Sequence, residues 1–174
     1  MAKKVAVIAV NPVNGSGLFQ YLETFFENKI SYKTFAVDTT KDIKTNSGIS
    51  IHLDGVVADL KGKENEFDAV VFSCGDAMIP GAQNNEQAMG DALAVLAEFN
   101  KLNKLIAGHC ASAIIFDKAG IATGKRLAVH PLGKAAIQKG TATDDAYTID
   151  GNIYTAQCEH TIHLMLPDLL EGLR

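Results

Sequence analysis

The chain has 174 residues, of which 47% are hydrophobic and 21% charged, and its formal net charge at pH 7 is −4. These values are typical of a soluble globular protein, and we expect one domain, residues 1–174, with a substantial core. The negative charge, without long runs of lysine or arginine, argues against nucleic acid as a partner. No apolar run approaches the roughly 20 residues of a membrane span. Three cysteines are too few for a disulfide framework, so we expect a cytoplasmic protein in a reducing compartment.

The first half of the chain alternates between predicted strands and helices. Residues 4–10 form an apolar, β-branched run typical of a buried strand, and the apolar positions of 18–28 recur at helical spacing. Residues 32–37 predict a second strand. The polar segment 39–68 predicts a surface hairpin rather than part of the core. Its two weak strand signals lie at 49–53 and 56–60.

The second half continues this alternation. Predicted strands cover 68–73, 105–109, 126–129, 146–149 and 153–156, with Asp150-Gly151 as a hairpin turn between the last two. Predicted helices cover 86–102, the residues after Cys110, a short stretch from Pro131, and 161–173. Buried strands that alternate with helices predict an α/β fold with a mostly parallel sheet covered on both faces. Ligands of such sheets bind beyond the carboxyl ends of the strands, so the residues that follow the strands are the candidates for a site.

The most informative segment is 105–116, where an apolar strand breaks at a single cysteine, Cys110. Gly108, Ala111 and Ser112 surround the break, and an apolar, helix-compatible run follows. This pattern is typical of a nucleophile elbow, because a strand that turns sharply into a helix leaves no space for bulky neighbours. At a helix N-terminus the free N–H groups and the helix dipole favour a thiolate. The segment therefore predicts a reactive cysteine, although a buried, inert cysteine in a strand-to-helix turn fits the same pattern.

Several motifs follow one another in a specific order along the chain. They are Asp68-Ala69-Val70-Val71-Phe72 leading to Gly75, Gly81-Ala82-Gln83-Asn84, the segment around Cys110, Val129-His130-Pro131-Leu132, and Asp150-Gly151. In order and spacing the chain resembles the ThiJ/PfpI superfamily, also described as class I glutamine amidotransferase-like, almost from end to end. The resemblance implies a flavodoxin-like three-layer sandwich with a nucleophile elbow, assembled as a homodimer or higher homo-oligomer. Members are described as intracellular proteases or amidases, as enzymes acting on glyoxals, or as stress-related redox proteins.

The resemblance also implies roles for individual residues. The backbone N–H groups of Gly75 and Ala111 would form an oxyanion pocket beside Cys110, because a tetrahedral intermediate needs donors already in place. His130 matches a histidine that lies near the cysteine in many members, and an imidazole titrates near neutrality, which suits proton transfer. Alternatively, His130 only caps or packs beneath the pocket.

The chain departs from the superfamily pattern at two places near the cysteine. Many members carry a glutamate at the position that falls on Gly17, and here no acidic residue occurs between Asn11 and Leu22. A helix dipole alone contributes about 0.3–1 kcal/mol, less than one pKa unit, so a strongly activated Cys110 would need another partner. Protease-like members carry a histidine directly after the cysteine, whereas here His109 precedes it on the opposite face of the strand. This argues against peptide hydrolysis in particular.

A third departure adds reactive side chains to the expected site. Cys74 and Cys158 occupy turns that are glycine- or proline-rich in the superfamily, and Glu159 and His160 follow directly. With Cys110, these residues would lie at the carboxyl edge of one sheet. Glu159 or His160 would then supply the missing acid/base partner, or Cys74 or Cys158 would resolve an oxidised Cys110 as a disulfide. A Cys/His zinc site and small, unreactive filler cysteines are the remaining alternatives. We expect neither a metal nor a cofactor.

Four further residues are expected to line the pocket: Asn11, Asn14, Gly17 and Asp76. Asn11 and Asn14 would donate hydrogen bonds to a small polar ligand, and Asp76 would bind substrate or cap a turn. We therefore expect cysteine-dependent chemistry through Cys110 on a small carbonyl or amide substrate, as in a protease/amidase-type hydrolase or a glyoxalase-like enzyme. The alternative is a non-enzymatic redox-sensing or chaperone-like stress protein that uses oxidation of Cys110.

Overall fold

A seven-stranded sheet forms the centre of the molecule in the computed structural model, which describes residues 2–174. Its strand order is β10-β11-β7-β6-β1-β2-β5. Neighbouring strands are parallel except for β10 and β11, which form an antiparallel hairpin at one edge. The strands are β1 (Lys4–Ala9), β2 (Ser31–Ala36), β5 (Gly55–Val56), β6 (Ala69–Ser73), β7 (Leu105–His109), β10 (Tyr147–Asp150) and β11 (Ile153–Ala156). Two smaller sheets pair β3 (Asp42–Lys44) with β4 (Ser50–His52) and β8 (Arg126–Ala128) with β9 (Thr141–Thr143).

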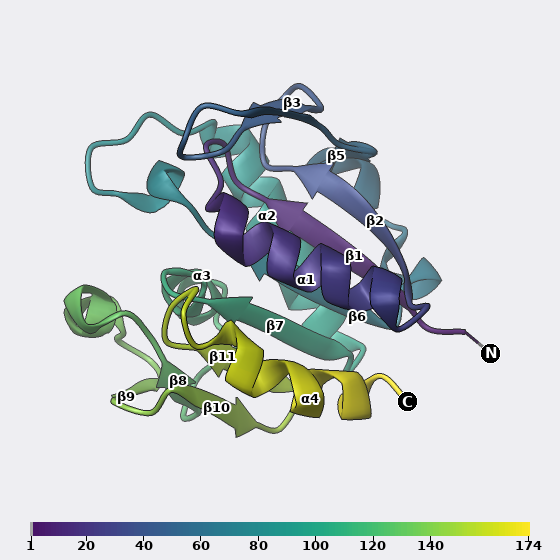
Figure 1. Cartoon of the computed structure of the whole chain (residues 1–174). Helices are drawn as coiled ribbons and strands as arrows, with labels where there is room; N and C mark the ends of the chain where they lie inside the picture. The colour runs from purple at the N-terminus through teal and green to yellow at the C-terminus, as the bar shows by residue number, and fades with distance from the viewer. Residues whose placement is uncertain (1) are drawn as a thin grey trace.

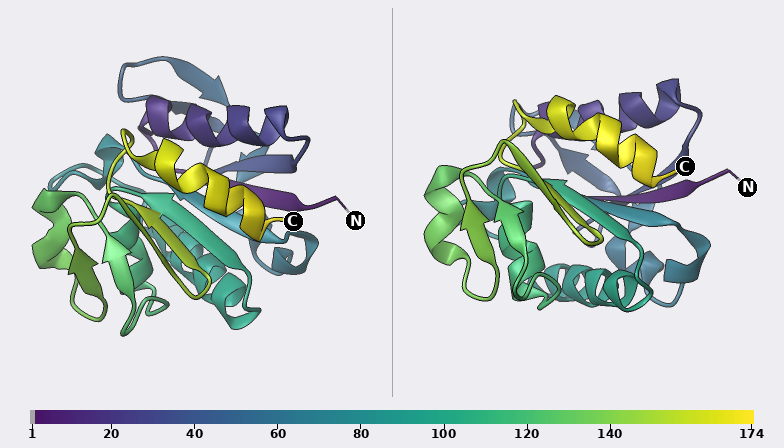
Figure 2. Two further views of the ribbon diagram at one scale, coloured as in Figure 1. Left: turned by 60° about the horizontal axis from the view of Figure 1, so that its bottom comes forward. Right: turned by 90° about the horizontal axis from the view of Figure 1, so that it is seen from below.

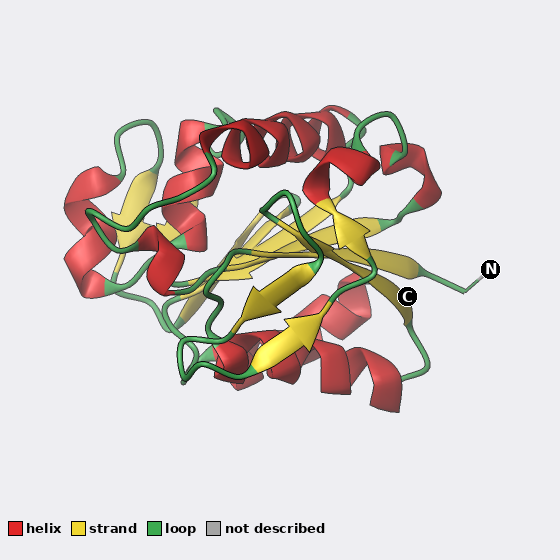
Figure 3. Ribbon diagram, turned by 90° about the horizontal axis from the view of Figure 1, so that it is seen from above, coloured by secondary structure: helices red, strands yellow, loops and turns green. Residues whose placement is uncertain are grey.

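Helices cover both faces of the central sheet (Figure 1). The α-helices are α1 (Gly15–Glu27), α2 (Glu86–Lys101), α3 (Ser112–Lys118) and α4 (Ile162–Gly172). The right-hand view of Figure 2 and the view in Figure 3 show α1 and α4 over one face of the sheet and α2 over the other. Short 3-10 helices are η1 (Val57–Leu60), η2 (Glu64–Glu66), η3 (Asp76–Met78) and η4 (Pro131–Ala136). The predicted flavodoxin-like, three-layer α/β sandwich with a mostly parallel sheet is therefore confirmed. No helix in the described part of the chain is long and apolar enough to cross a membrane.

Alternate residues of each strand face opposite helical layers. In β6, Val70 and Phe72 pack in the cluster that contains α2 and α3 residues, whereas Ala69 and Val71 pack in the cluster of α1 and α4. Both faces of such a strand are buried, which explains its continuous apolar sequence. The same alternation in β7 directs His109 toward the α1 and α4 layer.

Of the two strands predicted for a surface hairpin within residues 39–68, the strand at 49–53 is confirmed as β4, and the strand at 56–60 is wrong. The hairpin is formed by β3 and β4, while residues 55–56 form β5 at the edge of the central sheet and residues 57–60 form η1. Gly48, with a φ of 90°, lies in the turn between β3 and β4, a conformation that glycine adopts at little cost. A long-range contact also fixes β3, because the Asn11 Oδ1 accepts a hydrogen bond from the Lys44 N–H at 3.0 Å. Strand β9 was not predicted at all.

The carboxyl ends of the parallel strands meet at one edge of the sheet. β1 leads into Asn11, β6 into Cys74, β7 into Cys110 and β11 into Cys158. This edge lies on the left in Figure 1. The topology thus brings together most of the residues that the sequence analysis singled out, as the rule for parallel sheets predicts.

Candidate active site

The chain turns sharply at Cys110, between β7 and α3. Cys110 has a φ of 54°, in the left-handed region that costs a residue with a Cβ about 1–2 kcal/mol. Its N–H donates to the Ala156 carbonyl at 3.0 Å, which holds the turn against β11. The Ser112 Oγ donates to the Phe72 carbonyl at 2.8 Å. A Cβ at Gly108 would lie 2.5 Å from the Ser112 Cβ, so only small residues fit beside the turn. The strained strand-to-helix turn predicted at Cys110 is confirmed.

The environment of Cys110 favours its thiolate. A hydrogen bond with the Cys74 thiol is the largest influence on the pKa of Cys110 and lowers it below the usual range of cysteine. Partial burial of Cys110 opposes this effect, and a hydrogen bond from the Ala111 N–H supports it. The carboxylate of Glu159 raises the pKa of Cys110 by its negative charge. The net direction is downward, so Cys110 ionises more readily than an ordinary cysteine.

Cys74 is the hydrogen-bonding partner of this thiolate. It follows the last residue of β6 and is buried, with 3% of its surface exposed. The hydrogen bond with Cys110, burial, and the charge on Cys110 together raise the pKa of Cys74 well above its usual range. Cys74 therefore keeps its proton and donates it toward the Cys110 sulfur. This role was not among the alternatives considered from the sequence, which treated Cys74 as a resolving thiol, a metal ligand or a filler.

Gly75 lies where two loops at the site meet. A Cβ at this position would lie 2.3 Å from the Pro12 carbonyl oxygen, 2.5 Å from the Val13 Cα and 2.6 Å from the Asn14 N. The Asn14 N–H also donates to the Cys74 carbonyl at 2.8 Å, which fixes the two loops to each other. Within residues 2–174, the Gly75 N–H has no hydrogen-bond acceptor. It therefore remains available as a donor, as an oxyanion pocket requires.

Three of the expected pocket residues make hydrogen bonds that hold the loops in place. The Asn11 Nδ2 donates to the Asp38 Oδ2 at 2.8 Å. The Asn14 Oδ1 caps α1 by accepting from the Gly17 N–H at 2.6 Å. Asp76 is exposed at the start of η3, and its N–H donates to the Asn46 Oδ1 at 2.9 Å. These contacts fix the loops that follow β1 and β6.

His109 is a buried histidine whose effect on the site was not foreseen. Its Nδ1 lies 3.3 Å from the Tyr21 hydroxyl, on the α1 side of the sheet, as the alternation of the strand predicted. Burial lowers the pKa of His109 to about 4, despite the opposing charge of Glu159, so the ring is neutral at pH 7. Its Nε2 and the Ser73 Oγ are buried without a hydrogen-bond partner in the described part of the chain. A Cβ at Gly17 would lie only 2.4 Å from this Nε2. The His109 ring therefore occupies the space beside Gly17.

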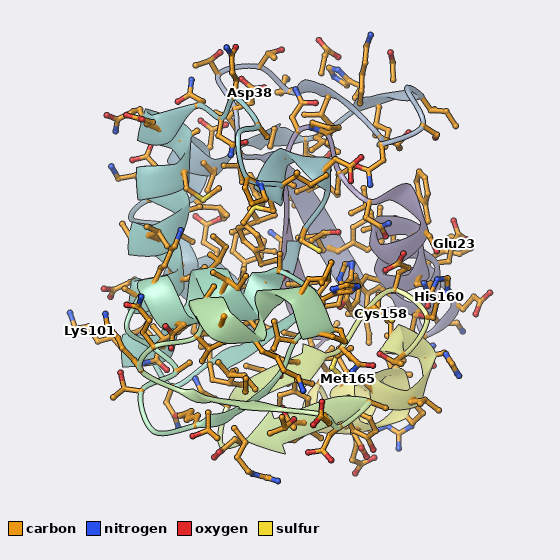
Figure 4. All side chains as sticks on the ribbon, turned by 90° about the vertical axis from the view of Figure 1, so that its left-hand side faces the viewer. Glu23, Asp38, Lys101, Cys158, His160 and Met165 are labelled. Atoms are coloured by element: carbon orange, nitrogen blue, oxygen red, sulfur yellow. The ribbon has the colours of Figure 1, made fainter. Side chains whose placement is uncertain are left out.

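The remaining candidates lie on the loops that follow β8 and β11. His130 is half-buried, and its Nδ1 accepts a hydrogen bond from the Leu132 N–H at 3.2 Å, so it caps η4. Cys158 is half-buried in the turn after β11. The His160 Nε2 lies 3.8 Å from the Glu159 Oε1, with 84% of the His160 side chain exposed. Figure 4 shows Cys158 and His160 in the view onto the carboxyl edge of the sheet.

Among residues 2–174, no three His, Cys, Asp or Glu side chains converge as metal ligands. A hollow of about 290 Å³ lies at the opposite edge, with Lys3, Lys104 and Tyr154 in its wall. Cys110, by contrast, is half-exposed between loops.

Comparisons with known proteins agree with this geometry. The model of the DJ-1/PfpI family matches residues 3–171. Protein ppBat of Bacteroides thetaiotaomicron is 59% identical over the whole length of both chains. The crystal structure of a protein from the same organism, named putative protease I, has a TM-score of 0.95 and 59% identity, and the match covers 99% of this chain and 100% of that one. Oxidized DJ-1 of Toxoplasma gondii has a TM-score of 0.85 at 20% identity, over 99% of this chain and 91% of that one, and shares the fold.

Proposed function

Because the chain belongs to the DJ-1/PfpI family, we propose that it is an enzyme that uses Cys110 as a nucleophile on a small carbonyl or amide compound. The observation that carries this proposal is the strained turn at Cys110, next to the Cys74 thiol that lowers the pKa of Cys110. A protein that kept the turn only for its shape would have no need of a donor beneath the cysteine. The lowered pKa of Cys110 supports attack by a thiolate near neutral pH.

The proposed chemistry begins with the Cys110 thiolate and the carbonyl carbon. A sulfur–carbon bond forms while the electron pair of the carbonyl double bond moves to the oxygen. The N–H groups of Gly75 and Ala111 would hold the resulting oxyanion. With an amide, the intermediate expels the amine, which takes up a proton, and water then hydrolyses the thioester. With an aldehyde, the oxyanion takes up a proton to give a hemithioacetal.

Both reactions need a proton donor, and His130 is suited to this role. Because its Nδ1 accepts the hydrogen bond from the Leu132 N–H, the neutral ring carries its proton on Nε2. Glu159 and His160, on the neighbouring loop, are auxiliary candidates. We do not assign this role to His109, because its Nδ1 contacts the Tyr21 hydroxyl and burial lowers its pKa to about 4.

The test is turnover of small compounds by the purified protein. Glyoxal and chromogenic amides of small carboxylic acids represent the two substrate classes. We expect Cys110→Ala to abolish turnover and His130→Ala to reduce kcat. The control His52→Ala replaces an exposed histidine on β4 and should leave turnover unchanged. Absence of turnover with every member of both classes would refute the proposal, and it would favour a redox-sensing or chaperone-like role of Cys110.

A further inference from the structure

Cys74 and Cys110 directly follow the neighbouring strands β6 and β7. The parallel register of β6 and β7 pairs Phe72 with Gly108, and the same offset continued by two residues would bring Cys74 level with Cys110. Neighbouring strands are about 4.8 Å apart, and a disulfide requires Cα atoms about 4.4–6.8 Å apart. The Cys74 thiol lowers the pKa of Cys110, and Cys110 raises the pKa of Cys74, as is expected of neighbouring side chains. The backbone thus places this pair within the range in which a disulfide forms.

The two cysteines differ in their access to solvent. Cys110 is half-exposed at the turn, whereas Cys74 is buried beneath it. A dissolved oxidant therefore reaches Cys110 first, and Cys74 is in contact with the sulfur that becomes oxidised. In peroxide chemistry these are the positions of an attacking thiol and a resolving thiol.

Cys158 is placed less favourably. The register of β11 with β7 pairs Ala156 with His109, so Gln157, and not Cys158, is level with Cys110. The Cys158 N–H and carbonyl are both bonded to the Thr161 hydroxyl, which fixes this turn at the start of α4. The fold thus distinguishes between the two cysteines that the sequence left as alternatives.

We propose that Cys74 resolves an oxidised Cys110, so that peroxide converts the pair into a Cys74–Cys110 disulfide that reversibly switches the site off. This inference rests on the proposed function only in that Cys110 must be reactive. The oxidant is hydrogen peroxide or an organic hydroperoxide, and the reductant that restores the site is a dithiol.

The disulfide would form in two steps. The Cys110 thiolate attacks one peroxide oxygen, the O–O bond breaks, and the departing hydroxide or alkoxide takes up a proton, which leaves a sulfenic acid on Cys110. The Cys74 sulfur then attacks the Cys110 sulfur, an S–S bond forms, and the S–O bond breaks. The departing hydroxide takes the proton from Cys74 and leaves as water. Two thiols have then lost two electrons in total, and the peroxide has gained them.

The charge on Cys110 would determine when Cys74 becomes a nucleophile in the second step. Two of the influences that raise the pKa of Cys74 are its hydrogen bond with Cys110 and the negative charge on Cys110. The negative charge disappears once Cys110 has become a neutral sulfenic acid, so this part of the rise in the pKa of Cys74 is lost, while burial continues to raise it. Cys74 is therefore a protonated donor while Cys110 is reduced and becomes a better nucleophile when Cys110 is oxidised.

The experiment treats the full-length, reduced protein with a small excess of hydrogen peroxide and measures the intact mass and the number of free thiols. Three cysteines are free in the structure, and we expect one to remain, in a protein lighter by two hydrogen atoms. A digest without reducing agent should link the peptides of Cys74 and Cys110. Addition of dithiothreitol should restore all of the thiols, together with the turnover of the untreated enzyme where turnover is measured.

Three variants separate the alternatives. Cys74→Ser and Cys74→Ala should instead gain two oxygen atoms at Cys110 as a sulfinic acid, and thermal unfolding checks that each is folded. Cys158→Ser should still form the disulfide. A wild-type protein that accumulates sulfinic acid at Cys110 as fast as Cys74→Ser, or a disulfide that contains Cys158, would overturn the inference and leave the proposed function intact. If Cys110 reacts neither with peroxide nor with iodoacetamide, both proposals fail.

Discussion

Replacing Gly17 with alanine is expected to destabilise the protein, although alanine is the better helix former. Gly17 is the third residue of α1, and a Cβ there would lie 2.4 Å from the His109 Nε2 and 2.8 Å from the Asn14 Oδ1. Overpacking of this kind costs about 1–3 kcal/mol. It also threatens the cap that Asn14 provides through its 2.6 Å hydrogen bond with the Gly17 N–H, and a cap is worth about 1 kcal/mol. The gain in helix propensity is at most about 1 kcal/mol. The net expectation is a loss of about 1–2 kcal/mol.

Urea unfolding measures this loss as a lower midpoint at unchanged slope. Gly90→Ala is the matched control, because Gly90 lies within α2 and a Cβ there would meet nothing within 4 Å. That variant should gain up to about 1 kcal/mol. A double-mutant cycle with His109→Ala then isolates the contact, and removal of the ring should recover at least about 0.5 kcal/mol of the Gly17→Ala loss. If Gly17→Ala is as stable as Gly90→Ala, the His109 ring does not fill the space beside position 17.

Three further predictions concern ionisable groups. Burial lowers the pKa of His109 from 6.5 to about 4. Between these two pH values the unfolded chain binds a proton that the folded protein does not bind. Stability should therefore fall by about 3 kcal/mol between about pH 6.5 and pH 4, and urea unfolding of His109→Gln should lack this decline. Glu159→Gln should lower the pKa of Cys110, because the carboxylate raises it. The pH dependence of Cys110 alkylation measures this pKa. A higher pKa in the variant would show instead that Glu159 activates the thiol. Burial raises the pKa of Asp117, but hydrogen bonds from the N–H groups of residues 138–140 outweigh it, and the net pKa is lowered. The resulting stability is present above about pH 4 and is lost as the pH falls below it, so thermal unfolding of Asp117→Asn should show a loss of about 2–4 kcal/mol at pH 7 and a weaker dependence on acid.

The central strands and the position of the sharp turn could be predicted from the sequence. β1, β6 and β7 are apolar throughout because both faces of the sheet are covered. Few structures other than a buried strand are compatible with such short apolar runs. The small residues around Cys110 indicated a turn with no space for larger ones, and Gly108 has none. The strands and the sharp turn could be predicted because each depends on residues that are close together in the sequence.

The hairpin of β3 and β4 could not be placed, because its position depends on distant contacts. The Asn11 side chain binds the Lys44 N–H, and Val13 bridges to Thr45, across more than thirty residues. The local pattern in 49–60 favours a strand pair equally well, but β5 pairs instead with β2 of the central sheet. Long-range pairing of this kind overrides local propensity.

That Cys74 is the partner of Cys110 could not be predicted from the sequence either. That Cys74 lies level with Cys110 follows from the register of β6 and β7, which a single sequence does not determine. Each cysteine directly follows a buried strand, and comparing the two positions would have suggested the pair. The contact of His109 with Gly17 depends on how α1 packs on the sheet, so it required the structure.

The measurement that tests the account most directly is the pH dependence of Cys110 alkylation. The rate is followed by peptide mass in Cys158→Ser, with Cys74 intact, and again after the further change Cys74→Ala. With Cys74 present we predict a midpoint below the ordinary cysteine value of about 8.5, because the Cys74 thiol stabilises the thiolate. The midpoint should rise when Cys74 is replaced. A midpoint at or above about 8.5 that does not depend on Cys74 would contradict the account, because Cys110 would then be an ordinary thiol at a strained turn.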